Sequence, residues 1–180
     1  MAKKVLIIST SLRNHSNSEI LAHETERGAK DAGNDVEFLS LKGKNIQFCK
    51  GCFACQKLGK CVIKDDANAI TEKMKNAEVI VWATPIYFYE MSGQMKTMID
   101  RASSLYTSNH NFHEVYLITT SESDEKDVIQ TVMHGVNGWM RCLNNVHLKG
   151  FVEAGGVNEP KEVSTRRDYM EQAYNMGKNI

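Results

Sequence analysis

The sequence predicts an α/β protein with a doubly wound five-stranded parallel sheet, and three observations lead to this fold class. Short apolar runs of strand length alternate five times with longer amphipathic stretches along the 180 residues. The short runs are continuously apolar, which indicates strands that are covered on both faces of a sheet. Helical connections between parallel strands are right-handed, and five strands at this length favour the order 2-1-3-4-5. We expect a single domain over residues 1–180.

The expected strands are runs dominated by Val, Ile and Leu. They are Val5–Ile8, Asp35–Leu41, Val79–Ala83, Val115–Thr119 and Val146–Glu153. The longest unbroken apolar run has five residues, whereas a membrane-spanning helix needs roughly 20, so we expect no membrane contact. The N-terminus leads directly into the first strand without a signal peptide, which predicts a cytoplasmic protein.

The expected helices are the longer amphipathic stretches between the strands. They are Ser18–Ala32, Asp66–Asn76, Met91–Ser103, Asp124–Leu143 and Lys161–Lys178. Ser16 and Glu19 have the spacing of a capping box at the start of the first helix, which ends at Gly33. Asp65 and Asp66 are typical of a helix N-cap rather than of a pair of metal ligands.

The charge balance argues against several classes of protein. Lys and Arg total 22 and Asp and Glu total 22, so the formal net charge is zero. A nucleic-acid-binding protein usually has a basic excess, and a small soluble electron carrier usually has a strongly acidic surface. We therefore expect neither. The cysteine count is five, and an odd count without a signal peptide is a poor fit to a secreted disulfide framework.

The loop after the first strand, residues 9–18, has the chemistry of a phosphate site. It contains no glycine, which excludes a P-loop and a dinucleotide-binding fingerprint. It is rich in hydroxyls and small amides and leads into a helix N-terminus, where free N–H groups favour an anion. Arg13 adds a guanidinium that suits phosphate. The alternative is that these polar residues only cap the helix and fill a turn.

The stretch after the third strand places three aromatic residues beyond a strand end: Tyr87, Phe88 and Tyr89. Ligands of doubly wound sheets bind where strands 1 and 3 diverge, and flat apolar side chains there suit a planar ring system. The alternative is that the aromatics pack on the end of the sheet or form a dimer contact. Beside a phosphate loop, they suggest a flat ligand with a phosphate tail.

A Cys-rich loop at residues 42–64 contains the motif C-x2-C-x2-C-x5-C, formed by Cys49, Cys52, Cys55 and Cys61. Four thiolates in a short loop can wrap around a cubane cluster, although the ferredoxin motif has a shorter last gap followed by Pro. Cys142 lies apart from this motif, and we expect it to be a thiol of the core.

The charge around the Cys motif is one-sided. Residues 38–64 include six Lys and no acidic residue. Such cations stabilise an anionic cluster, lower the pKa of nearby thiols and attract an anionic nucleotide. Three alternatives to a cluster remain open: free thiols, a disulfide or redox pair, and a zinc site.

Three of these segments together resemble one family. Ser9–Ser18, Cys49–Asp66 and Thr84–Arg101 are similar to the NAD(P)H-dependent FMN reductases of flavodoxin-like fold, and in particular to the iron–sulfur flavoproteins among them. Many members open with a Gly-Ser-Pro-Arg type of loop. This chain has Ser9-Thr10-Ser11-Leu12-Arg13 instead, so the Gly and Pro are replaced.

The resemblance implies FMN as the cofactor. Its phosphate would be held by residues of the first loop, namely Ser9, Ser11, Leu12, Arg13, Ser16, Asn17 and Ser18. Its isoalloxazine would lie on Pro85, Ile86, Tyr87 and Phe88, approached from the next strand by Thr119 and Ser121. The resemblance also implies a [4Fe–4S] cluster held by Cys49, Cys52, Cys55 and Cys61.

The activity implied is that of an oxidoreductase. NAD(P)H would pass a hydride to FMN, and the flavin would reduce a second acceptor, such as a quinone or another flavin, in a ping-pong cycle. The cofactor carries this chemistry, so we expect no catalytic side-chain acid or base. The alternatives are an iron–sulfur flavoprotein that relays electrons between protein partners and a non-catalytic flavin-binding regulator. The resemblance further implies a homodimer or homotetramer.

Overall fold

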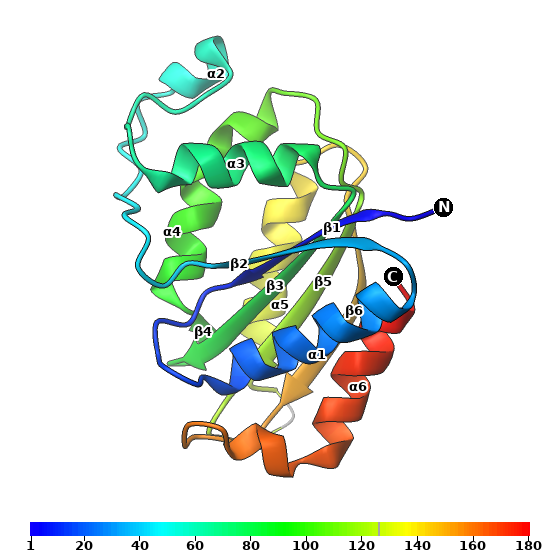
Figure 1. The fold of residues 1–180 in the computed structure, drawn as a ribbon. Helices are drawn as coiled ribbons and strands as arrows, with labels where there is room; N and C mark the ends of the chain where they lie inside the picture. Colours follow the sequence, from blue (N-terminus) through cyan, green and yellow to red (C-terminus); the bar gives the residue numbers. More distant parts are fainter. Residues whose placement is uncertain (126) are drawn as a thin grey trace.

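The structure is a computed structural model that describes residues 1–125 and 127–180. Within these ranges the parallel strands have the order β2-β1-β3-β5-β6 (Figure 1). This confirms the predicted order 2-1-3-4-5, because the short β4 lies off this path and shifts the numbers of the last two strands. The strands are β1 (Lys4–Ser9), β2 (Asp35–Ser40), β3 (Val79–Tyr87), β4 (Glu90–Met91), β5 (Glu114–Thr120) and β6 (His147–Ala154). The two-residue β4 pairs antiparallel with the end of β3.

Helices cover both faces of the sheet, as the doubly wound prediction requires (Figure 1). One face carries α1 (Asn17–Asp31) and α6 (Arg167–Lys178), and the other carries α3 (Asp66–Asn76), α4 (Gly93–Arg101) and α5 (Gln130–Arg141). The short α2 (Ala54–Leu58) lies away from the sheet, within the Cys-rich loop. Of the helices described here, none combines the length and apolar character needed to cross a bilayer.

The core consists of two apolar layers that share the strands. Ile8, Trp82 and Leu117 point to the layer under α3, α4 and α5, whereas Ile7 and Val81 point to the layer under α1 and α6. Successive residues of a strand face opposite sides, so a strand buried on both sides must be apolar at every position. This arrangement is the physical cause of the continuous apolar runs in the sequence.

The helices α1 and α6 pack with their backbones in close contact. A Cβ atom at Gly28 would lie 2.0 Å from the carbonyl oxygen of Tyr174, and one at Gly177 would lie 2.0 Å from the carbonyl oxygen of Thr25. Only glycine allows this approach. The contact fixes α1, whose N-terminus follows the loop predicted to bind phosphate.

The third strand differs from its expected bounds. It continues beyond Ala83 to Tyr87 and then turns back into β4. Phe88 and Tyr89 form the turn, with φ values of 50° and 62°. Two central residues with positive φ match the twist of a tight hairpin, although Asn and Gly are the usual residues there.

Two helices begin later than expected. The stretch 124–143 is helical only from Gln130 to Arg141, and its residue 126 lies outside the described residues. The last helix begins at Arg167, because Lys161 adopts a left-handed φ of 68° and is followed by a 3-10 turn at Glu162–Thr165.

Candidate functional site

The carboxyl ends of β1, β3 and β5 are adjacent in the sheet, so the loops that follow them meet at one edge. The backbone joins the first two directly, since Thr10 N–H donates to the carbonyl of Ala83 over 2.9 Å. Two of the predicted cofactor-binding segments, residues 9–18 and 85–88, therefore lie side by side. The residues after β5 complete the same edge.

The loop after β1 ends at a capped helix, as predicted. The Ser16 hydroxyl accepts from the backbone N–H of Glu19 over 3.3 Å. Ser9 and Ser18 are fully buried on either side of this loop. Among the described residues, neither hydroxyl has a hydrogen-bond partner. A buried polar group without a partner is costly, so these two hydroxyls are available to a ligand.

A later segment of the chain completes this loop. Asn17 donates from Nδ2 to the carbonyl of Glu159 over 3.0 Å and accepts from Val163 N–H over 3.1 Å. Arg13 donates from Nη1 to the carbonyl of Asn158 over 2.5 Å. The sequence reasoning missed residues 158–163, because these contacts join positions about 145 residues apart. Leu12 is half exposed at the tip of the loop.

A buried network of three hydroxyls joins the loop after β1 to the hairpin. Thr10 Oγ1 lies 3.0 Å from Ser92 Oγ, and Thr84 Oγ1 donates to Ser92 Oγ over 3.2 Å. Ser92 also accepts from Met95 N–H and thereby caps α4. All three hydroxyl residues are fully buried. No pattern in the sequence indicates this network, because predicting it requires knowing which strand ends are neighbours.

The hairpin presents its aromatic residues outward. Phe88 is fully exposed and Tyr87 is about half exposed, whereas Pro85 and Ile86 are partly buried at the end of β3. The Tyr89 hydroxyl donates to Glu125 over 3.3 Å, and the charge of this carboxylate raises the pKa of Tyr89. Tyr87 and Phe88 thus form an exposed aromatic surface beside the loop after β1.

The hydroxyls of Thr119 and Ser121, at the end of β5 and just after it, differ in their hydrogen bonding. Thr119 is fully buried, and its hydroxyl has no hydrogen-bond partner among the described residues. Ser121 instead donates to the carbonyl of Ser123 over 2.7 Å, so its hydroxyl stabilises its own loop. Gly155 allows that loop to pack closely, because a Cβ there would lie 2.8 Å from Cα of Asp124.

The Cys-rich loop forms one wall of a cavity of about 710 Å³. All five cysteines line it: Cys49, Cys52, Cys55, Cys61 and Cys142. The opposite wall comes from α4 and α5, and the hairpin residues Glu90 and Met91 reach one end. In the part of the chain that the structure describes, no three metal-binding side chains converge on one point. The prediction that Cys142 belongs to the core is wrong, because this thiol is exposed.

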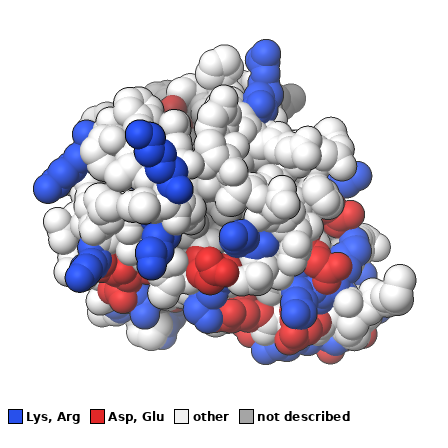
Figure 2. All heavy atoms as spheres, turned by 90° about the horizontal axis from the view of Figure 1, so that it is seen from above, with Lys and Arg blue, Asp and Glu red and all other residues white. Residues whose placement is uncertain are grey.

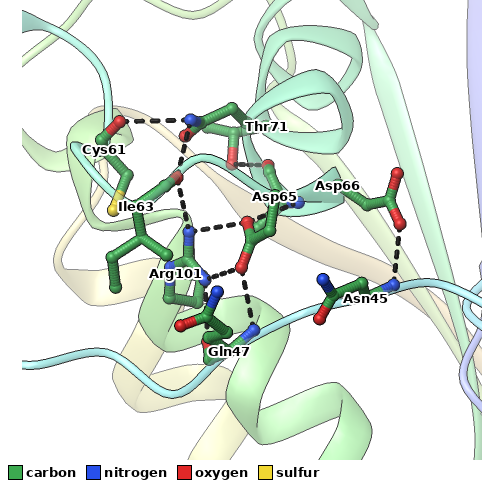
Figure 3. A network of polar contacts seen from close by, with 10 residues as sticks. Asn45, Gln47, Cys61, Ile63, Asp65, Asp66, Thr71 and Arg101 are labelled. Carbon is green, nitrogen blue, oxygen red and sulfur yellow. Dashed lines mark hydrogen bonds and ion pairs between the residues drawn. The ribbon is translucent and has the colours of Figure 1, made fainter.

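A buried ion pair closes the base of the Cys-rich loop (Figure 3). Arg101 at the end of α4 donates to both carboxylate oxygens of Asp65, over 2.5 and 2.8 Å, and both side chains are fully buried. The predicted capping role of Asp65 is confirmed, since it accepts from Ala67 N–H over 3.1 Å. Its pairing with Arg101 was not predicted, because nothing in the spacing of the two residues indicates it.

The ion pair sets the protonation of its two partners. Burial alone would raise the pKa of Asp65, but the hydrogen bonds from Arg101 and from Gln47 N–H outweigh it and lower that pKa. The Asp65 carboxylate raises the pKa of Arg101, and the adjacent Cys61 thiol contributes in the same direction. Both shifts favour the charged form of their group.

The surface around the Cys-rich loop is basic. The six lysines of residues 38–64 are all exposed: Lys42, Lys44, Lys50, Lys57, Lys60 and Lys64. Figure 2 views the molecule from the top of Figure 1, and most acidic side chains in that view lie in its lower half, with Lys and Arg side chains among them. The upper half is mostly uncharged and carries several Lys or Arg side chains.

Relatives and solved structures agree with this architecture. An iron–sulfur flavoprotein from Methanocaldococcus jannaschii is 39% identical over 102 residues, which cover 57% of this chain and 53% of that protein. The match thus spans about half the length of that relative. An iron–sulfur flavoprotein from Methanosarcina thermophila is 28% identical over 84% of this chain and 77% of its own.

The fold also matches an NAD(P)H:quinone oxidoreductase from Methanothermobacter marburgensis. The TM-score is 0.76 at 16% identity, over 99% of this chain and 97% of the other. The sequence model described as NADPH-dependent FMN reductase matches residues 3–152. That match includes the loop after β1, the Cys-rich loop, the hairpin and the residues after β5, and the chain therefore belongs to the NADPH-dependent FMN reductase family.

Proposed function

We propose that this protein is an FMN-dependent oxidoreductase that oxidises NAD(P)H and reduces a second acceptor in a ping-pong cycle. One observation carries the proposal: the hydroxyls of Ser9 and Ser18 are buried without partners where β1 leads into α1. Unpaired hydroxyls beside a helix N-terminus match the donors that a phosphate group requires. The family supports FMN as the molecule that carries this phosphate.

The residues present fit FMN at both ends. Beside Ser9 and Ser18, the phosphate would be held by Ser11, Leu12, Arg13, Ser16 and Asn17 of the same loop. The ring would lie on Pro85–Phe88, where two partly buried residues lead into two exposed aromatics. Thr119, with its unpaired buried hydroxyl, and Ser121 would approach from the neighbouring strand.

When bound, FMN supplies the redox chemistry, in which NAD(P)H is oxidised and an acceptor such as a quinone or flavin is then reduced. The chain's residues bind and orient. The Thr10–Thr84–Ser92 network holds the phosphate loop and the hairpin in a fixed relation. Tyr87 and Phe88 offer a flat exposed surface on which a nicotinamide or an aromatic acceptor can stack. We assign no side-chain acid or base.

Flavin binding tests the proposal. The purified protein should be yellow, or become so when FMN is added and the excess is removed. Arg13→Gln should weaken FMN binding by about tenfold or more, because a charge-assisted hydrogen bond to phosphate contributes about 1.5–3 kcal/mol. Arg27→Gln is the matched control, since Arg27 lies further along α1 over Tyr174. A protein that stays colourless after FMN has been added and the excess removed would overturn the proposal.

A second candidate is an iron–sulfur flavoprotein that relays electrons between partners through FMN and a [4Fe–4S] cluster. Cys49, Cys52, Cys55 and Cys61 line one cavity under a lysine-rich surface, and thiolates with nearby cations suit an anionic cluster. Iron and acid-labile sulfide measured after oxygen-free purification decide between the two. About four irons per chain favour the relay, and their absence eliminates it.

Assembly belongs to the same proposal. We expect a homodimer or homotetramer, because the exposed apolar side chains include Phe53, Phe88 and Tyr106. Large exposed aromatics commonly mark contact surfaces. Sedimentation of the flavin-loaded protein tests this expectation, and a monomer at micromolar concentration would contradict it.

A further inference from the structure

The two ends of the Cys-rich loop meet at a single side chain. Arg101 donates from Nη1 to the carbonyl of Gln47 over 2.7 Å and from Nη2 to the carbonyl of Ile63 over 3.3 Å (Figure 3). Gln47 precedes the first cysteine of the motif by two residues, and Ile63 follows the last by two. The guanidinium therefore clamps the whole motif at its base.

The same point is reinforced by α3. Asp65 accepts from Gln47 N–H over 2.8 Å (Figure 3). Asn68 donates from Nδ2 to the carbonyls of Cys61 and Ile63, over 3.1 and 2.9 Å. The base is thus a closed set of hydrogen bonds, whereas Cys49 and Cys52 are exposed. The hydrogen bonds that close the loop therefore lie at its base, away from these two cysteines.

One donor of Arg101 is left over. A guanidinium has five N–H groups, and the four on Nη1 and Nη2 correspond to the four acceptors in Asp65, Gln47 and Ile63. Nε is buried and has no partner among the described residues. Arg101 lines the same cavity as Cys61, and the Cys61 thiol contributes to the raised pKa of Arg101. The spare donor is therefore available to a sulfur atom at this end of the motif.

We propose that Arg101 is a positioning residue of the Cys motif: it holds both ends of the loop together and offers its Nε–H to sulfur at Cys61. The part that concerns a bound cluster rests on the iron–sulfur candidate above. Lysine could not replace it, because an ammonium lacks the planar fork that serves Asp65 and two carbonyls at once. Asp65 holds the guanidinium in place through Nη1 and Nη2, which leaves Nε free for this contact.

The test compares three forms of the full chain. Arg101→Lys keeps the charge but removes the fork and Nε. Lys96→Gln is the matched control, because Lys96 lies on the same helix and lines the same cavity but is exposed. The double variant Arg101→Gln with Asp65→Asn removes both buried charges together, so neither is left unpaired in the interior. It keeps the clamp testable if Arg101→Lys fails to fold.

The first readout needs no cluster. The Gln47 amide donates to Asp65, so its hydrogen–deuterium exchange reports on the closed base directly. We expect exchange to become at least about tenfold faster in Arg101→Lys and in the double variant. Lys96→Gln should change it less than about twofold, because an exposed cation contributes little to a buried network.

The second readout uses protein reconstituted with iron and sulfide without oxygen. Arg101→Lys should lose iron to a chelator about 10–100 times faster than the wild type, the range typical of lost outer-shell contacts. Its cluster potential should also be more negative, because a hydrogen bond to sulfur stabilises the reduced state. Lys96→Gln should stay close to the wild type in both respects.

The outcomes separate this proposal from the proposed function. Unchanged Gln47 exchange in folded variants would overturn the clamp, whatever the iron content. Unchanged iron loss and potential, with faster exchange, would overturn the contact with sulfur and keep the clamp. A wild type that takes up no iron would overturn both the relay and the sulfur contact, while the exchange rates still decide the clamp.

Discussion

The loops at the ends of the strands and the Cys-rich loop are built on opposite principles. At the strand ends, buried hydroxyls join neighbouring loops to one another, as those of Thr10, Thr84 and Ser92 do. In the Cys-rich loop only the base is tied, through Arg101 and Asp65. Its tip exposes Phe53 and several lysines to solvent.

The difference indicates how each region can hold a ligand. The strand-end loops are held in place by the sheet, so a ligand there meets groups already in position and orders little on binding. The tip of the Cys-rich loop exposes Phe53 and Leu58, although α2 also contacts the 3-10 turn at Ser103–Tyr106. A cluster or a cross-link would add bonds among the cysteines of this loop. The two regions should therefore respond separately to mutation.

A cysteine substitution should give the largest difference between the two regions in its effects on iron binding and on FMN affinity. Cys52→Ser should abolish iron binding, because a hydroxyl is a poor ligand for a cluster. FMN affinity should change less than about twofold, since the strand-end loops do not include this residue. Iron assay and flavin titration on the same sample measure both. Cys142→Ser is the matched control and should retain iron, and loss of iron from both variants would show that the motif alone does not define the site.

Gly28→Ala should disturb only the strand-end region. The new methyl group would lie 2.0 Å from the carbonyl oxygen of Tyr174 and push α1 away from α6. We expect a loss of about 3 kcal/mol in the free energy of unfolding, together with weaker FMN binding. Denaturant unfolding measures the first. Gly138→Ala, where a Cβ meets no atom within 4 Å, should stabilise by about 0.5–1 kcal/mol.

Ser92→Ala tests the hydroxyl network and should destabilise the protein less than Gly28→Ala does. It leaves Thr10 and Thr84 without their shared partner in the core. The expected loss is about 1–3 kcal/mol of unfolding free energy, with weaker FMN binding and unchanged Gln47 amide exchange. Thr97→Ala, at a partly exposed position on the same helix, should cost less than about 0.5 kcal/mol. Equal effects from both variants would contradict a special role for the network.

The smallest effect should come from pH at Glu162. Its carboxylate accepts from the N–H groups of Glu159 and Asn158, which lower its pKa from the usual 4.5. A lowered pKa stabilises the folded state above the unfolded value, and that stabilisation is lost as the pH falls through the folded pKa. Wild type should therefore melt above Glu162→Gln at pH 7, and the gap should narrow as the pH falls below about 4.5 and through the lower folded pKa.

Most of the fold could be predicted because it follows from local pattern. Strands buried on both faces must be apolar throughout, and Ser16 and Asp65 cap their helices as their spacing indicates. The hairpin after β3 was missed, because its turn uses Phe88 and Tyr89 where a sequence signal would need Asn or Gly.

The candidate site was predictable only in part. The sequence indicated the loop after β1 and the aromatic segment, because each is continuous in the chain. It could not indicate the Arg101–Asp65 pair or the contacts of Asn17 with residues 158–163, which join distant positions. The core position expected for Cys142 failed because a helix with several apolar neighbours can still present one exposed face.

The contacts of residues 158–163 with the loop after β1 also affect when the site can form. Asn17 and its partner Glu159 are 142 positions apart. At roughly 5–20 residues per second, a ribosome needs about 7–28 s to synthesise that interval. The phosphate loop is thus incomplete on the growing chain until most of the sheet has been made. Flavin capture should therefore follow folding of the whole sheet, and an unfinished chain should not retain the cofactor.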